Sequence, residues 1–154
     1  MSGIELRTVG WVRGGRGAAE DDAWDRETAA IELDTSWLTA EALQGLAEFS
    51  HAEIVFQFDQ LPESEVVLTA RHPRGNPDWP KVGVFAQRGR NRPNRLGVSV
   101  CRILGVDGTR LLVGGLDAID GTPVLDIKPV LAEFLPRGEV RQPDWSRELM
   151  ADYW

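Results

Sequence analysis

The sequence is short of the residues that most often build covalent cross-links and metal sites. It has one cysteine, Cys101, and two histidines, His51 and His72, among 154 residues. A single cysteine excludes a disulfide within the chain and is typical of proteins in a reducing compartment. Neither histidine has a second histidine or a cysteine at ligand spacing, so we expect no metal site.

Long apolar runs and an excess of basic charge are also lacking. No apolar run reaches the roughly 20 residues that a transmembrane helix needs, and no basic stretch followed by an apolar one opens the chain. We therefore expect a cytoplasmic protein without a membrane segment or signal peptide. The formal net charge of -7 argues against a general nucleic-acid coat, yet it leaves room for a local basic site.

Three common motifs of nucleotide binding or catalysis are absent. The segment GGRGAAED lacks the third glycine of a GxGxxG fingerprint, and no helical pattern follows it. A Rossmann nucleotide site is therefore not expected. The sequence has no GxxxxGK[ST] phosphate-binding loop and no GxSxG nucleophile elbow.

Short β-strands dominate the secondary structure that the sequence predicts. Residues 52–59 alternate apolar and polar side chains, which is typical of a strand with one buried face. Residues 96–106 and 109–118 flank Asp107-Gly108, a strong hairpin signal. Further strands are predicted at 4–12, 28–33, 65–70 and 123–129. Short helices are predicted at 39–49 and in the tail after a Ser146 cap.

These elements indicate one mainly β domain over residues 1–154. Many strands with hairpins and little helix favour a small antiparallel barrel or sandwich. No repeat, linker or second domain is visible. We expect the tail, from about residue 130 to 154, to pack on this domain.

A rigid, basic loop is the first segment that points to function. The stretch RGRNRPNRLG, residues 88–97, holds four arginines on an otherwise acidic chain. A solvated loop is one interpretation. The other is that its guanidinium groups meet an anion, either RNA phosphates or acidic groups such as the Glu-Asp-Asp of residues 20–22.

An aspartate-rich turn is the second such segment. GGLDAIDGTPVLDIKP carries Asp117, Asp120 and Asp126 around a Gly-Thr-Pro turn. D-G-T-P is a good turn by itself. Carboxylates near exposed backbone also suit ribose hydroxyls and a cationic ligand, so a binding site and a plain turn both remain open here.

The two segments together resemble the TrmO/TsaA-like family. This chain has GVFAQRGRNRPNRLGVS where the family pattern is G-V-F-A-T-R-S-x-F-R-P-N-P-I-G-L-S, and DAIDGTPVLDIKP where it is D-x-x-D-G-T-P-V-L-D-I-K-P. The resemblance runs from about residue 10 to residue 129. It implies an S-adenosylmethionine-dependent methyltransferase built on a β-barrel and working as a homodimer. Characterised members methylate N6 of threonylcarbamoyl-adenosine beside the tRNA anticodon.

By position, the resemblance also implies site residues. Those for the cofactor are Asp59, Gln60, Arg88, Leu96, Gly97, Val98, Ile119, Asp120, Gly121 and Thr122. Those for the methyl acceptor are Arg90, Arg92, Asn94 and Arg95. Gly97 and Gly121 are expected to let the backbone approach the ligand closely, and the Arg88 guanidinium suits the carboxylate of the donor.

The chemistry of the acceptor is less defined by the sequence. Asp126 or Lys128 would assist the loss of a proton from the acceptor nitrogen, unless the two only form an ion pair with each other. The family has an early P-R-Q element where this chain has an acidic segment, residues 14–26. A methyltransferase acting on a small molecule and a nucleoside-binding regulator without catalysis are therefore the alternatives to tRNA modification.

Overall fold

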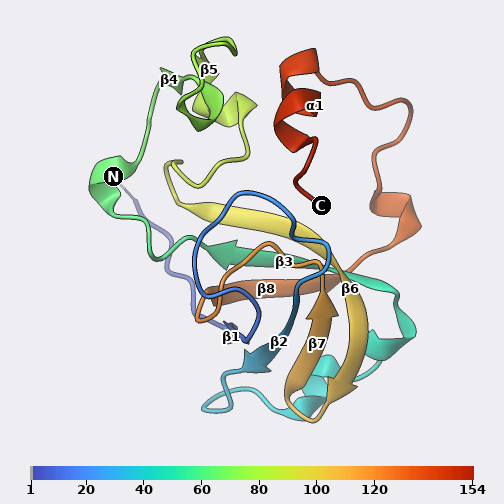
Figure 1. The fold of residues 1–154 in the computed structure, drawn as a ribbon. Helices are drawn as coiled ribbons and strands as arrows, with labels where there is room; N and C mark the ends of the chain where they lie inside the picture. Colours follow the sequence, from blue (N-terminus) through green and yellow to red (C-terminus); the bar gives the residue numbers. More distant parts are fainter. Residues whose placement is uncertain (1) are drawn as a thin grey trace.

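The computed structural model describes residues 2–154, and its centre is a closed, antiparallel six-stranded barrel (Figure 1). Around the barrel the strand order is β1-β2-β7-β6-β3-β8. The strands are β1 (Gly10–Arg13), β2 (Thr28–Leu33), β3 (His51–Gln57), β6 (Leu96–Asp107), β7 (Arg110–Gly114) and β8 (Pro123–Pro129). The predicted mainly β, antiparallel barrel is confirmed.

The core of the barrel follows the alternation seen in the sequence. On β3, the side chains of Ala52, Ile54 and Phe56 are buried and point into the barrel. Ile31 of β2 and Val113 of β7 are fully buried opposite them. Because alternate residues of a strand face opposite sides, one face of each strand supplies the core and the other lies outside.

The hairpin between β6 and β7 was predicted one residue out of register. Asp107 still pairs with Arg110, so the two loop residues are Gly108 and Thr109. Gly108 has a φ of 61°, and a two-residue hairpin favours a residue that tolerates positive φ at this place.

Two other predicted elements differ from the structure. The first strand begins only at Gly10, and residues 39–49 form two 3-10 turns, η1 (Ala40–Leu43) and η2 (Leu46–Glu48), in place of a helix. Gly45 separates the two turns with a φ of 87°, which no continuous right-handed helix accommodates.

The predicted strand at 65–70 was wrong for most of its length. This segment leaves the barrel after the turn η3 (Glu63–Glu65) and becomes regular again only at β4 (Ala70–Arg71). β4 pairs with β5 (Val82–Gly83) in a small separate sheet. The turns η4 (Pro73–Gly75) and η5 (Val84–Ala86) accompany this sheet above the barrel.

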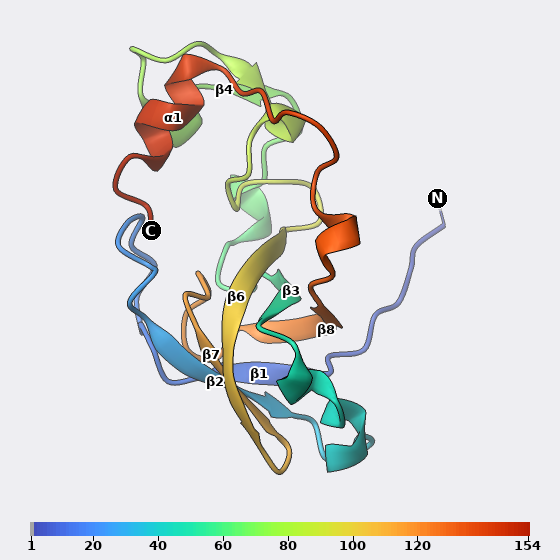
Figure 2. The same ribbon diagram turned by 90° about the vertical axis from the view of Figure 1, so that its right-hand side faces the viewer.

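The C-terminal part leaves the barrel as an arm and then returns to it (Figure 2). After β8 the exposed residues 131–144 include the turn η6 (Ala132–Phe134), and the helix α1 (Asp144–Met150) follows. Trp79 Nε1 donates to Glu148 Oε2 at 2.7 Å, which ties α1 to the small upper sheet. Ser146 lies within the first turn of α1 and donates to the carbonyl of Pro143, so it is not the N-cap residue.

Candidate functional site

A large open cleft lies between the barrel, the arginine loop and the C-terminal arm. Its volume is about 2220 Å³, whereas a site for one small molecule measures roughly 300–1,000 Å³. Its walls come from the end of β3, residues 85–94 and 96–100, residues 117–119 with Thr122, and the arm with α1. The cleft therefore has room for more than one small ligand.

Three non-glycine residues with left-handed backbone lie on or next to the walls of this cleft. Their φ angles are 64° for Ala23, 53° for Arg74 and 52° for Arg95. Such conformations cost free energy and concentrate at functional sites. The strain supports the cleft as the candidate site.

Two arginines of the basic loop hold the loop itself in shape. Arg92 Nη1 donates to the carbonyl of Gln87 at 2.7 Å, and Arg95 Nη1 donates to the carbonyl of Leu61 at 2.8 Å. Both side chains are partly buried by these contacts. Of the predicted acceptor-binding residues, Arg92 and Arg95 are thus already engaged within the chain.

The other predicted residues of this loop are more open. Arg88 lines the cleft, and its one side-chain hydrogen bond goes to the carbonyl of Val98 at 2.8 Å. Arg90 and Asn94 also line the cleft, are exposed, and make no side-chain hydrogen bond within residues 2–154. These three side chains are therefore placed to meet a ligand.

The end of β3, where the resemblance implies cofactor-binding residues, lies beside this loop. Phe58 donates its backbone N–H to the carbonyl of Arg95 at 2.7 Å. Asp59 and Gln60 follow, are exposed, and line the cleft. Gln60 Nε2 donates to Asp59 Oδ2 at 3.3 Å, so the two polar groups form one small polar patch.

Gly97 has a packing role that the sequence did not predict. Gly97 lines the cleft together with Leu96 and Val98, and a Cβ on it would lie 2.5 Å from the ring of Phe56 and 3.0 Å from that of Phe58. The two rings pack edge to face, with centroids 5.3 Å apart. Glycine is needed here because aromatic rings lie against the strand, whereas close approach of a ligand to Gly97 stays a prediction.

The aspartate-glycine-threonine turn is tied to the start of the chain. Asp120 Oδ1 accepts the backbone N–H of Gly14 at 2.9 Å, and Gly121 donates to the carbonyl of Val12 at 2.7 Å. Thr122 is buried, and its hydroxyl donates to the carbonyl of Ile119 at 2.7 Å. Ile119 and Thr122 line the cleft, whereas Asp120 and Gly121 do not. The carboxylate of Asp120 therefore positions a loop in this structure.

Asp126 and Lys128 form the ion pair that was the alternative to a catalytic role. Lys128 Nζ lies 3.2 Å from Asp126 Oδ2, with both side chains at least half exposed. Lys128 lines the large cleft, but Asp126 faces a small second cleft beside η1 and η2. A solvent-exposed ion pair of this kind contributes little to stability, and a catalytic role for either residue stays a prediction.

A contact that sequence reasoning missed joins residues 36 positions apart. Asp117 Oδ2 accepts a hydrogen bond from the hydroxyl of Tyr153, and Asp117 Oδ1 is buried without a hydrogen-bond partner among residues 2–154. Both residues line the large cleft. Burial and the nearby Asp117 carboxylate raise the pKa of Tyr153. The D-x-x-D spacing draws attention to Asp117, but no sequence signal links it to Tyr153.

Cys101 is a buried structural thiol, as its apolar neighbours predict. It is 2% exposed. Burial raises the pKa of Cys101 to about 12, so the reactive thiolate is scarce at neutral pH. Among residues 2–154, no three histidine, cysteine or acidic side chains gather in a way that would hold a metal ion. No helix in the same residues is long and apolar enough to cross a membrane.

The comparisons with known proteins identify the family. The family model described as "tRNA-methyltransferase O N-terminal domain" matches residues 19–134. The chain belongs to the TrmO family. This match confirms the resemblance found in the sequence motifs.

Relatives and solved structures agree with this membership. A Pseudomonas aeruginosa protein named "Putative S-adenosylmethionine-dependent methyltransferase RcsF" is 38% identical over 131 residues, which cover 82% of this chain and 53% of the relative. The Escherichia coli "tRNA (adenine(37)-N6)-methyltransferase" is 46% identical over 114 residues, or 69% of this chain and 47% of the relative. This chain thus spans about half the length of these curated relatives.

The same family appears among crystal structures. A structure of TrmO from Pseudomonas aeruginosa has a TM-score of 0.70 and 31% identity, covering 91% of this chain and 62% of that one. Another TrmO structure has a TM-score of 0.75 and 29% identity, covering 92% of this chain and 64% of that one.

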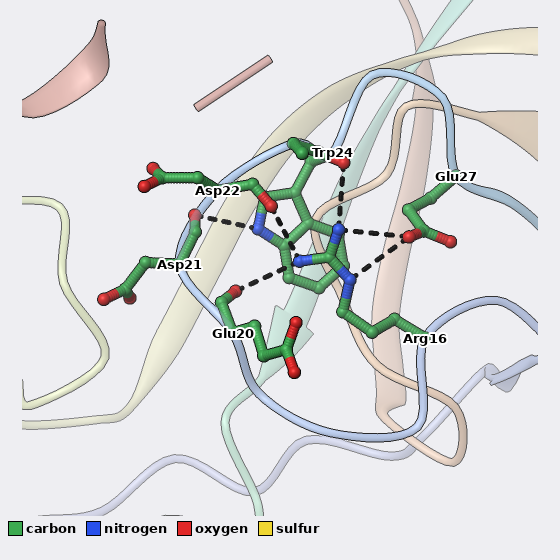
Figure 3. Close-up of polar contacts among 7 residues, drawn as sticks. Arg16, Glu20, Asp21, Asp22, Trp24 and Glu27 are labelled. Carbon is green, nitrogen blue, oxygen red and sulfur yellow. Dashed lines mark hydrogen bonds and ion pairs between the residues drawn. The ribbon is translucent and has the colours of Figure 1, made fainter. Parts of the chain in front are cut away.

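The acidic segment that replaces the family's P-R-Q element is folded around one arginine (Figure 3). The guanidinium of Arg16 lies 3.9 Å from the centre of the Trp24 ring. It donates to the carbonyls of Asp22 and Ala23, each at 2.9 Å, and pairs with the Glu27 carboxylate at 3.0 Å. The segment is therefore an ordered wall of the cleft.

The carboxylates of this segment do not pair with the basic loop of their own chain. Asp22 Oδ1 lies 3.0 Å from Arg74 Nη2, and Asp21 Oδ2 lies 3.9 Å from Arg74 Nε. Within residues 2–154, the partner of the Glu-Asp-Asp segment is thus Arg74 of the upper sheet. Arg90 remains free of such a pair in the same residues.

Proposed function

We propose that this chain is an S-adenosylmethionine-dependent methyltransferase domain that methylates N6 of threonylcarbamoyl-adenosine beside the tRNA anticodon and works as a homodimer. The observation that carries the proposal is the meeting of distant segments at one cleft. Arg88, residues 96–98, Ile119 and Thr122 all reach it, within a chain that matches the TrmO family over residues 19–134.

The residues around the cleft fit the cofactor. S-adenosylmethionine, when bound, supplies a methyl group on a positively charged sulfur. The exposed Arg88 guanidinium would hold its carboxylate, and Asp59 with Gln60 would bind its ribose or adenine through their oxygen and amide groups. The buried and unpartnered oxygen of Asp117 is a further polar atom suited to a ligand that donates hydrogen bonds.

The loop residues that remain open would recognise the acceptor. Arg90 and Asn94 are exposed at the cleft, while Arg92 and Arg95 keep the loop rigid from behind. Methyl transfer is an in-line displacement, so a rigid wall that fixes the acceptor nitrogen opposite the sulfur lowers the barrier through orientation. With few free arginines, we expect weak tRNA binding and a shallow salt dependence.

An exposed apolar surface supports the homodimer. Phe85 and Phe134 are 80% and 85% exposed, and Val98 and Val100 on the outer face of β6 are 40% and 46% exposed. All four line the large cleft. Exposed apolar side chains grouped in this way are typical of an interaction surface. A second subunit entering the cleft would cover them and would complete the walls of the cofactor site.

One observation favours a small-molecule acceptor as the second candidate. The chain has a net charge of -7, and three of the four loop arginines, Arg88, Arg92 and Arg95, donate to backbone carbonyls. Few positive groups are then left for phosphates. An acceptor smaller than tRNA requires only the part of the cleft that is lined by the arginine loop and by the segment around Trp24.

The experiment supplies methyl-labelled S-adenosylmethionine together with total tRNA, or with the small-molecule fraction of a cell. We expect label in tRNA, in a modified adenosine on nucleoside analysis. Arg90→Ala should lower transfer while cofactor binding persists, and Arg110→Ala, at the distant β6–β7 hairpin, serves as the control. Label in small molecules alone would support the second candidate. Cofactor binding with no transfer to either fraction would favour a regulator.

A further inference from the structure

Asp117 is a half-buried residue whose buried carboxylate oxygen Oδ1 has no hydrogen-bond partner within residues 2–154. It follows β7 and lines the large cleft. Its Oδ2 accepts from the Tyr153 hydroxyl, and its Oδ1 has no hydrogen-bond partner within residues 2–154. Buried polar atoms are nearly always paired, so an unpaired carboxylate oxygen in a ligand cleft indicates a place for a ligand donor.

The hydroxyl of Tyr153, the hydrogen-bond partner of Asp117, only partly compensates the negative charge of the carboxylate. A phenol supplies one neutral O–H, whereas a buried carboxylate is best stabilised by a cation with several N–H groups. The hydroxyl of Tyr153 also keeps its proton, because burial and the carboxylate of Asp117 raise the pKa of the phenol. Tyr153 is therefore a donor here and never a competing anion at neutral pH.

Two arginines lie close enough to this pair to act on it electrostatically. The positive charges of Arg74 and Arg88 both favour the ionised form of Tyr153, in opposition to burial and Asp117. Arg74 is already paired with Asp21 and Asp22, whereas Arg88 makes one bond to a backbone carbonyl. Arg88, with an exposed guanidinium, and Asp117, with one unpaired carboxylate oxygen, thus both line the large cleft.

Opposite charges placed in this way are complementary to an α-amino acid group. We infer that Asp117 binds the α-ammonium group of S-adenosylmethionine while Arg88 binds its carboxylate, and that the Tyr153 hydroxyl occupies the ammonium position in the free protein. This inference rests on the proposed function. It gives the cleft a way to select the amino-acid end of the cofactor and not only its nucleoside.

The side chain of Tyr153 must move away from Asp117 when the cofactor binds. Ala23 and Trp24 donate their backbone N–H groups to the carbonyls of Asp152 and Tyr153, each at 2.9 Å. These bonds anchor the backbone of the segment, so a rotation of the Tyr153 side chain is enough to release Asp117. Binding of the ammonium group then competes with one internal hydrogen bond.

The test is isothermal titration of the folded protein with three ligands. S-adenosylmethionine has the ammonium and the sulfonium, S-adenosylhomocysteine has only the ammonium, and 5′-methylthioadenosine has neither. We expect Asp117→Asn to weaken binding of the first two by roughly tenfold to a hundredfold, the usual loss for a hydrogen bond to a charged group. Binding of 5′-methylthioadenosine should stay within about twofold of wild type.

Two further variants sharpen the test. Tyr153→Phe removes the internal competitor and should strengthen binding of S-adenosylmethionine by about tenfold. Asp107→Asn, in the exposed β6–β7 hairpin, is the matched control and should bind all three ligands like wild type. Thermal melting of each variant checks that it is folded.

The possible results separate this inference from the proposed function. A wild-type protein that binds none of the three ligands overturns both. An Asp117→Asn variant with wild-type affinities overturns the inference alone, since the cofactor then binds elsewhere in the cleft. A loss confined to S-adenosylmethionine overturns the ammonium assignment in favour of the sulfonium. A Tyr153→Phe variant with weaker binding shows that the hydroxyl helps to hold the cofactor and overturns the role of internal competitor.

Discussion

The guanidinium of Arg16 lies 3.9 Å from the centre of the Trp24 ring and satisfies the backbone of the segment that surrounds it. Trp24 is 4% exposed, and its Nε1 donates to the carbonyl of Asp21. A loop rich in acidic residues thus becomes a fixed structure, since a single cation faces inward against an aromatic ring. The backbone N–H groups of Ala23 and Trp24, in the same loop, donate to the carbonyls of Asp152 and Tyr153 and so fix the C-terminal segment.

We expect Arg16→Lys to lower the free energy of unfolding by about 1–3 kcal/mol, because an ammonium group cannot reach the carbonyls and the carboxylate at once. Urea denaturation measures the change. Arg7→Lys is the control: Arg7 also lies over a tryptophan, 4.2 Å from the centre of the Trp37 ring, but Trp37 is 41% exposed. Equal losses in the two variants would contradict the role given to Arg16.

We expect Gly97→Ala to destabilise the barrel by about 1–3 kcal/mol, the usual cost of overpacking a core. The new methyl group would lie 2.5 Å from the ring of Phe56, which is 2% exposed and has no room to move. Gly89→Ala, where no atom lies within 4 Å of the added carbon, should be nearly neutral. The melting temperatures of the two variants provide the comparison, and a neutral Gly97→Ala would refute the packing argument.

We expect Asp120→Ala to reduce both stability and cofactor affinity, each by about 0.5–1.5 kcal/mol, since it removes the exposed hydrogen bond that the Gly14 N–H donates to Asp120. Asp120→Asn should retain both properties, because an amide oxygen accepts the same hydrogen bond. Chemical denaturation and calorimetry are measured side by side. Loss of affinity without loss of stability would instead indicate direct contact between Asp120 and the cofactor.

We expect the stability of the protein to fall as the pH rises from about 9 to about 12, partly through Cys101. Burial raises the pKa of this thiol from 9.0 to about 12, so over this range the unfolded chain loses a proton that the folded chain keeps. This group contributes a slope of about −1.4 kcal/mol per pH unit. The slope should be shallower for Cys101→Ala in urea titrations at several pH values, and identical slopes would contradict the burial effect.

We expect the protein to sediment as a dimer at micromolar concentration, and Phe134→Ser to shift it toward the monomer. Phe134 is 85% exposed and lies in the cleft, so its loss should not harm the fold. Leu104→Ser changes an apolar residue of β6 that is 55% exposed outside the cleft, and it should leave the dimer intact. A monomer in the wild type would count decisively against the homodimer.

The barrel was predictable because its signals are local. The alternation along residues 52–59 and the hairpin signal at residues 107–108 each define a strand from neighbouring side chains alone. The two wrong predictions, a helix at residues 39–49 and a strand at residues 65–70, have different causes, one within the segment and one in the packing of distant strands. Gly45 breaks the helical pattern of residues 39–49, whereas residues 65–70 leave the barrel because β6 and β8 already occupy both sides of β3.

The site was predictable in part, since the two long motifs carry many of the residues that line the cleft. Arg88, Arg90, Asn94, Ile119 and Thr122 lie on its walls, as the motifs imply. The motifs do not distinguish side chains that face a ligand from side chains that stabilise the loop through hydrogen bonds to its backbone. That distinction depends on which backbone carbonyl happens to lie within reach, as for Arg92 and Arg95.

By itself, the sequence determined the β-barrel, the family and the two segments that form the site, because strand alternation, turn chemistry and long motifs are properties of neighbouring residues. Only the tertiary structure decided the roles within that site. It joined Asp117 to Tyr153 and Arg16 to Trp24, and it turned Asp126 toward Lys128. Burial and hydrogen-bond partners arise from the packing of distant segments, and spacing along the chain does not encode them locally.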